Sequence, residues 1–238
     1  MNMKQFLAAA LLICLSVGAS AQSLKPQNLQ GFDYRGFHFG FLLSLNTSDF
    51  YIRVKPDYDF DNRLLSIDNA SQSGFNLALL ASADLTQNVH ARFIPGLSFQ
   101  DRGLYYRFLN DEQQVEPILK RTESVYLDLP LVWKLRTNRI NNFAAYALIG
   151  GKYSIDMQSQ KDVDNQSADE KILKLSKTDY SIDAGGGIDF FLPYFKFGME
   201  VKVATGLKNV LIQEDTRFSS PIESLRTRSV IVSFTFEG

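Results

Sequence analysis

Apolar and polar side chains alternate along much of this chain, which is the pattern of β-strands with one apolar face. In the first such stretch, Phe37, Phe39 and Phe41 alternate with His38 and Gly40. Phe and Tyr are abundant, and together with Thr, Val and Ile they favour strands over helices. We predict eight strands, over residues 37–46, 74–84, 88–99, 123–135, 143–156, 179–191, 194–205 and 225–236.

The lengths of these strands and of their connections indicate a membrane barrel. Each strand has ten or more residues, and a tilted strand needs about 9–11 to cross the hydrocarbon layer. Short turns on the periplasmic side and long loops outside are typical of outer-membrane barrels. Here long connections at 47–73, 100–121, 157–178 and 206–224 alternate with short ones near 86–87, 137–141 and 192–193.

The predicted fold class is therefore all-β, an eight-stranded antiparallel up-and-down transmembrane β-barrel in the outer membrane. The alternative is a soluble sandwich or lipocalin, which would carry most of its charge on the exposed face of each strand. Here the polar faces mix Gly, Ser and other small residues with charges, which suits a narrow interior.

The first residues have the order of parts of a secretory signal peptide. Lys4 lies in a short polar start, an apolar run extends from Phe6 to Leu15, and the small residues Ala19-Ser20-Ala21 follow. The apolar run is about ten residues long, too short for the ~20 of a membrane-spanning helix. We expect cleavage after Ala21. The predicted division is a signal peptide at 1–21, a periplasmic N-terminal segment at 22–36 and the barrel at 37–238.

Cysteine and charge content exclude several functions. The single cysteine, Cys14, lies in the signal peptide, and Ile13 precedes it where a lipoprotein signal needs a small residue. The mature chain therefore has no disulfide and no thiolate metal site. The chain has 25 basic and 26 acidic side chains, and this balance argues against a nucleic-acid partner.

The predicted interior carries charges of both signs. An eight-stranded barrel is just filled by its own side chains, and paired charges would close it further. We therefore expect neither an open pore nor a small-molecule substrate. The inward charged residues are Arg92, Lys134, Lys152, Lys196, Lys202, Asp128, Asp156, Asp183, Asp189 and Glu200.

The only two histidines, His38 and His90, are the first candidates for chemistry. Both are predicted to face the interior, and some small outer-membrane barrels are lipid-modifying enzymes with a Ser and His pair. Ser44 and Ser98 share these faces a few positions away, but no motif joins a base to a nucleophile. We expect interior histidines that are hydrogen-bonded to carboxylates, and we predict no catalytic residue.

Asp57, Asp59 and Asp61 have the every-second spacing that begins a calcium-binding loop. Asn62 stands where such a loop needs Gly, and Asp68 stands where it needs a bidentate Glu. A solvated acidic loop is the favoured interpretation, with calcium binding as the alternative. We predict no metal and no cofactor.

Glycines and aromatic residues in and around the sixth predicted strand have structural interpretations. Gly185, Gly186 and Gly187 match no dinucleotide-binding pattern, because a strand and not a helix follows them. They are expected to allow curvature or the close approach of an interior side chain. A periplasmic aromatic girdle is predicted from Phe190, Phe191, Tyr194 and Phe195 around Leu192-Pro193, with Phe234 and Phe236 near the chain end.

At these same stretches the chain resembles the PorT family of Bacteroidetes outer-membrane proteins, and the resemblance covers nearly the whole mature chain. The segments that carry it are Phe37-His38-Phe39-Gly40 with Leu45-Asn46-Thr47, then 93–99, 126–131, 139–142 and 189–197. These motifs are structural, and no catalytic residue is carried over from the family.

The resemblance implies a non-enzymatic accessory or assembly component of the type IX secretion system. This system exports proteins with a C-terminal signal across the outer membrane and supports gliding in some species. The implied partners are outer-membrane lipid and other secretion-system proteins of the outer membrane or periplasm. A structural or adhesion barrel is the alternative and a lipid-modifying enzyme is a distant third, because fold alone does not choose among them.

Overall fold

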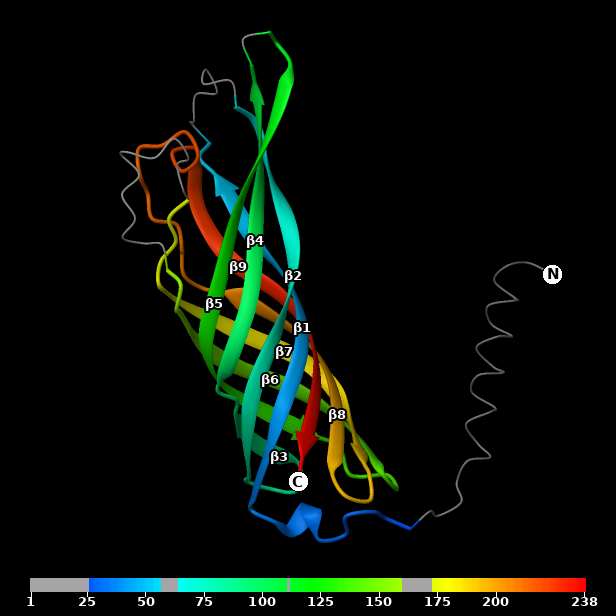
Figure 1. The fold of residues 1–238 in the computed structure, drawn as a ribbon. Coiled ribbons are helices and arrows are strands. Elements are labelled where there is room, and N and C mark those ends of the chain that lie inside the picture. Colours follow the sequence, from blue (N-terminus) through cyan, green and yellow to red (C-terminus); the bar gives the residue numbers. More distant parts are fainter. Residues whose placement is uncertain (1–25, 57–63, 111, 160–172) are drawn as a thin grey trace, which may run out of the picture.

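A computed structural model describes residues 26–56, 64–110, 112–159 and 173–238. The predicted signal peptide at 1–21 lies outside these residues. In the described part, strands form a tall, tilted barrel (Figure 1). They are β1 (Phe37–Val54), β2 (Leu64–Asp84), β3 (Val89–Phe93), β4 (Gly96–Leu109), β5 (Val115–Arg136), β6 (Phe143–Asp156), β7 (Thr178–Phe191), β8 (Lys196–Gly206) and β9 (Ile222–Glu237).

The strands form one closed antiparallel sheet. Apart from β3 and β4, strands that follow one another along the chain pair, and β1 pairs with both β2 and β9, which closes the ring. β3 and β4 are two parts of one wall strand, because both lie between β2 and β5. They are separated at Ile94-Pro95, where proline has no N–H for the ladder. The ring therefore has eight positions, and the predicted eight-stranded antiparallel barrel is confirmed.

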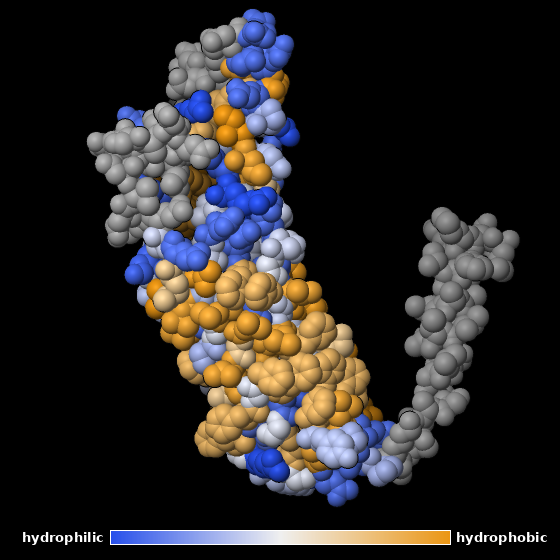
Figure 2. Space-filling model, in the orientation of Figure 1, coloured by the Kyte–Doolittle hydropathy of each residue, from blue (hydrophilic) through white to orange (hydrophobic). Residues whose placement is uncertain are grey.

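The register aligns apolar residues on the outer face. Leu43, for example, lies opposite Leu77 on β2 and opposite Phe234 on β9. Leu79 and Val201 are 68% and 54% exposed, as expected of side chains that face lipid. Figure 2 shows the result as a broad apolar band around the lower barrel, with a hydrophilic belt above it.

Two of the predicted long loops are mostly strand. β1 continues to Val54 and β2 begins at Leu64, whereas residues 47–73 were expected to form a loop. The expected loop at 100–121 is likewise occupied by β4 up to Leu109 and by β5 from Val115. These extensions form a ribbon that rises above the rest of the barrel (Figure 1).

The ribbon was missed because its alternation is inverted. Within the membrane band, inward residues such as Ser44 and Ser98 are polar. Beyond the band the inward residues become apolar, as at Phe50 and Leu104, which are 1% and 0% exposed. A search for strands with an apolar outer face therefore ends at the membrane boundary.

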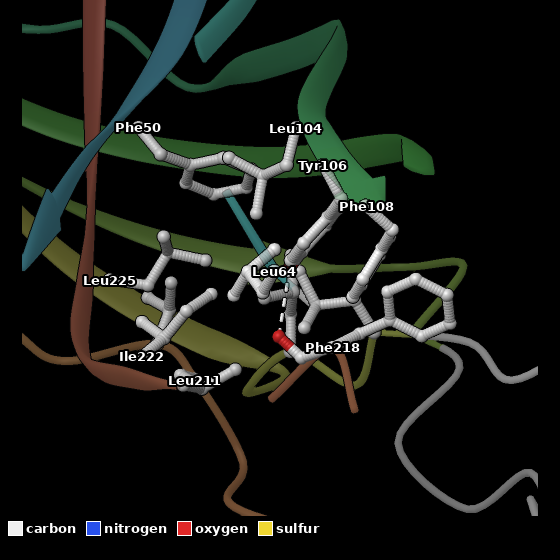
Figure 3. Packing of buried hydrophobic residues seen from close by; sticks show 12 residues of the cluster. Phe50, Leu64, Leu104, Tyr106, Phe108, Leu211, Phe218, Ile222 and Leu225 are labelled. Atoms are coloured by element: carbon white, nitrogen blue, oxygen red, sulfur yellow. Dashed lines mark hydrogen bonds between the residues drawn. The ribbon is translucent and has the colours of Figure 1, made fainter. Parts of the chain in front are cut away.

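The inward apolar residues of the ribbon build a hydrophobic core at the end of the barrel that carries the long connections (Figure 3). Tyr106 packs edge-on against Phe218, with ring centroids 5.1 Å apart, and its hydroxyl donates a hydrogen bond to the Phe218 carbonyl oxygen at 2.9 Å. This core closes the interior on that side. Its other members are Phe50, Leu64, Leu104, Phe108, Leu173, Leu175, Val210, Leu211, Ile222 and Leu225.

The opposite end carries the short connections and the described start of the chain. β7 and β8 are joined through 192–195, and β5 and β6 through 137–142. A single 3-10 turn, η2 (Phe32–Tyr34), lies across this end before β1 begins (Figure 1). In outer-membrane barrels the short turns lie on the periplasmic side, and we expect the same of this end.

Candidate functional site in the barrel interior

The interior of the barrel is filled with charged side chains, as their alternate positions along the strands predicted. Arg92 on β3 and Glu200 on β8 form the centre, with Nη1 and Oε1 2.5 Å apart and both side chains 0% exposed. Lys134 on β5 contacts both carboxylate oxygens of Asp189 on β7, at 2.7 and 2.9 Å. Opposite charges from distant parts of the chain therefore meet inside the ring.

The central pair belongs to a larger network. Glu200 also contacts Lys202 at 3.3 Å, and Arg92 lies 3.8 Å from Glu237. Glu237 in turn pairs with Lys196 at 2.8 Å. Charges buried this deeply persist only when they are paired, because each has lost its hydration.

A tyrosine fills the space beside this network. The Tyr146 hydroxyl donates to Glu200 at 3.1 Å, and the Lys134 ammonium lies 3.7 Å from the centre of the Tyr146 ring. A methyl group at Gly187 would lie 2.6 Å from this ring, so only glycine fits there. The predicted role of the glycine run, the close approach of an interior side chain, is confirmed at Gly187.

A second interior pair lies further along the barrel, between β5 and β6. Lys152 contacts Asp128 at 3.3 Å, and Ser154 donates a hydrogen bond to the same carboxylate at 2.6 Å. Of the other predicted interior carboxylates, Asp156 accepts a hydrogen bond from Ser124 at 3.2 Å. The sequence pattern therefore placed these charged side chains correctly on the inner face. It did not predict which residues pair, because the pairs form only when the ring closes.

Both histidines bind one carboxylate, as expected. Asp84, at the end of β2, lies 3.0 Å from His38 Nε2 and 2.6 Å from His90 Nδ1. The two candidate serines lie elsewhere: Ser44 donates to Ser233, and Ser98 donates to Asn76. In the hydrogen bonds of the described chain, neither serine is joined to a histidine.

The possible calcium loop is not tested. Asp57, Asp59, Asp61 and Asn62 lie outside the described residues. Asp68 lies on β2, where its carboxylate is 3.4 Å from Arg107. Over the ranges that the structure describes, no group of three or more His, Cys, Asp or Glu side chains is arranged to hold a metal ion.

The described part of the N-terminal segment covers the end of the interior that carries the short connections. Phe32 is 3% exposed and stacks on the His38 ring, with centroids 3.9 Å apart and planes 9° apart. Asp33 pairs with Arg136 at 2.8 Å and lies 3.6 Å from Arg139. We call Phe32 and Asp33, with these contacts, the plug. The sequence did not predict the plug, because Phe32 lies in no alternating pattern.

The plug also corrects one aromatic assignment. Phe191 was predicted to belong to the periplasmic girdle, but it is 1% exposed and packs beside Phe32. It occupies an inward position of β7, so its side chain enters the mouth of the barrel. Tyr194 and Phe195 in the following turn are 89% and 36% exposed, which agrees with a place at the membrane boundary.

Comparison with known proteins agrees with this architecture. A family model described as an outer membrane protein beta-barrel domain matches residues 20–211. The chain belongs to this family. As an outer membrane protein beta-barrel domain, the protein is located in the outer membrane, with its apolar band in contact with lipid. This family is broader than the PorT family, and the match does not show that the chain is a PorT protein.

Two solved structures are similar to this outer membrane beta-barrel. OprG from Pseudomonas aeruginosa is 12% identical, with a TM-score of 0.41, over 84% of this chain and 91% of that chain. Ail of Yersinia pestis, in complex with the heparin analogue sucrose octasulfate, is 10% identical, with a TM-score of 0.40, over 86% and 100%. No curated protein matches the sequence. Among the described residues, no helix is long and apolar enough to cross a membrane.

Proposed function

We propose that this barrel is a non-enzymatic accessory or assembly component of protein secretion, of the type IX kind that its sequence resembles. Its partners are then secretion-system proteins of the outer membrane or periplasm and the surrounding lipid. It acts on neither nucleic acid nor a small-molecule substrate. The observation that carries the proposal is an interior filled by its own side chains, combined with a strand ribbon that projects beyond the apolar band.

The filled interior argues for a function at the surface. The ion pairs of Arg92, Lys134 and Lys152 occupy the centre of the barrel. Phe32 covers one end and the core around Tyr106 covers the other. An eight-stranded barrel filled in this way offers no path for an exported protein, so a role in export would use its outer surfaces.

The projecting ribbon supplies such a surface. Tyr105 on β4 lies opposite Leu119 on β5, and these outward side chains are 41% and 36% exposed. Leu65 and Val115, further along the ribbon, are 52% and 54% exposed. Figure 2 shows apolar surface on this projecting part, separated from the membrane band by the hydrophilic belt. Exposed apolar patches away from lipid commonly contact other proteins.

A clean deletion strain tests the secretion role. Without the barrel, cargo proteins should remain in the periplasm with their C-terminal signals uncut, while other outer-membrane proteins assemble normally. Immunoblots of periplasm, outer membrane and medium would measure this, with complementation by the intact gene as the control. Normal release of cargo from the deletion strain would reject the role.

A structural or adhesion barrel is the second candidate, and the same ribbon favours it, because an exposed ribbon with apolar side chains is also suited to contact other surfaces. This function predicts that the deletion strain secretes normally but loses attachment or envelope integrity. Measuring secretion, surface attachment and detergent sensitivity in one strain separates the two candidates.

A further inference from the structure

The barrel wall has a weak point where β3 ends and β4 begins. Pro95 lies opposite Leu79 on β2, and Pro130 on β5 lies opposite Ile94, as the flanking registers require. Leu79 donates to the Pro95 carbonyl at 2.9 Å, and Ile94 donates to the Pro130 carbonyl at 3.2 Å. Neither proline has an N–H to return the bond. Two adjacent seams therefore each lack one ladder hydrogen bond.

An apolar groove lies on the outer face over this weak point. Its volume is about 470 Å³, within the range of ligand-binding sites in proteins. Its lining contains no charged side chain. The outward residues that line it are Phe41, Leu43, Leu77, Leu79, Leu97 and Leu127.

This groove and a cavity inside the barrel share lining residues. Leu42, Ala78 and Gly96 are residues of the inner face, yet they line this groove as well as an internal cavity of about 40 Å³. A methyl group at Gly96 would lie 2.4 Å from the Ala78 side chain, so the strands approach closely here. The groove therefore lies where Ala78 and Gly96 leave little side chain between the lipid face and the interior.

We propose that this groove binds one acyl chain of a membrane phospholipid. It lies in the apolar band, where hydrocarbon is the surrounding material, and an unfilled groove would lose dispersion contacts on one side. A flexible hydrocarbon chain can fill a groove of this size and apolar lining. Because the lining has no charged side chain, it offers no partner for the carboxylate of a free fatty acid. We therefore expect only the acyl chain in the groove, with the head group of the phospholipid in the membrane interface. This site is independent of the proposed role in secretion.

Photolabelling in vesicles tests the site. The full mature chain would be reconstituted in phosphatidylethanolamine and phosphatidylglycerol vesicles with a trace of phospholipid that carries a diazirine on its acyl chain. After irradiation and digestion, adducts should concentrate on peptides that contain Leu79, Leu97 and Leu127. Peptides from the opposite wall around Val203 should carry several-fold fewer adducts.

A matched pair of variants separates binding from general contact with lipid. Leu97→Trp places a large side chain in the groove and should reduce labelling there several-fold. Val203→Trp is the control, because Leu97 and Val203 are similarly exposed, at 42% and 45%, and both face lipid. It should leave labelling of the groove unchanged. Folding of each variant is checked by its shift in electrophoretic mobility on boiling, and Leu127→Phe replaces Leu97→Trp if that variant does not fold.

Three results would overturn the proposal. Adducts distributed evenly around the barrel would show that lipid contacts the groove no more strongly than it contacts the rest of the wall. Unchanged labelling in the folded groove variant would show that the adducts arise elsewhere. Labelling of the groove by a diazirine fatty acid of the same length, but not by the phospholipid, would reject the phospholipid as occupant.

Discussion

Replacing Glu200 tests the charged interior most sharply. Glu200 contacts Arg92 at 2.5 Å, Tyr146 at 3.1 Å and Lys202 at 3.3 Å, and its side chain is 0% exposed. Glu200→Gln keeps the volume but removes the negative charge. The carboxylate then left for the buried Arg92 guanidinium is Glu237, at 3.8 Å. Breaking a buried ion pair by removing one partner typically costs about 3–5 kcal/mol of unfolding free energy.

Urea unfolding in phospholipid vesicles would measure this cost through the fluorescence of Trp133, the single tryptophan, which faces lipid. The matched control is Glu223→Gln. Its ion pair with Arg53 has a similar length, 2.9 Å, but the two side chains are 41% and 67% exposed. Exposed pairs contribute about 0–1 kcal/mol, so the control should unfold almost like the wild type.

A double variant completes the test. Arg92→Met combined with Glu200→Gln removes the orphan charge as well, so it should be more stable than Glu200→Gln alone. The two effects are non-additive because the residues are in contact. Equal costs for Glu200→Gln and Glu223→Gln, or strict additivity in the double variant, would refute the network as described.

Three further results are expected. Val201→Arg should cost about 2–4 kcal/mol if Val201 lies at the membrane midplane, whereas the interior change Val132→Thr should cost less; equal costs in the same titration would mean that the faces are reversed. Planar-bilayer recordings should show no steady open channel, and large stable ohmic steps would contradict the closed interior. Burial raises the pKa of the Tyr106 hydroxyl, so this hydroxyl stays protonated in the folded protein at a pH at which it ionises in the unfolded chain. The unfolding free energy that it contributes should therefore fall as pH rises above about 10. Tyr106→Phe should lower stability by about 1 kcal/mol at neutral pH and flatten this alkaline loss, and an unchanged pH profile would contradict the assignment.

Alternation along the chain was sufficient to predict the lipid face and the interior. A period of two determines which side of a strand a residue occupies, so Phe39 and Phe41 were placed on the apolar face, and Arg92 and Glu200 inward. It does not determine partners across the barrel. Arg92 and Glu200 are 108 residues apart in the chain, and only closure of the ring brings them together.

The errors arose where the surroundings change. Phe50 and Leu104 belong to strands whose apolar face turns inward beyond the membrane. We looked for strands with an apolar outer face, and therefore predicted loops in these stretches. Phe191 was assigned to the girdle from its aromatic type, although its parity on β7 places it inside. Phe32 contacts His38 from a segment without periodicity, and no pattern in the sequence indicates that contact.

We propose that the protein acts through its projecting surface and not through chemistry in its interior. Complementation of the deletion strain tests this most directly. Tyr105→Ser with Leu119→Ser changes only outward side chains of the ribbon. His38→Gln with His90→Gln keeps hydrogen-bonding capacity near Asp84 but removes both imidazole bases.

With equal amounts of folded protein in the outer membrane, the measurement is the fraction of cargo released into the medium. We expect the histidine double variant to restore release close to the wild-type level, and the ribbon double variant not to restore it. Full release with the ribbon variant, together with loss of release in the histidine variant, would contradict it.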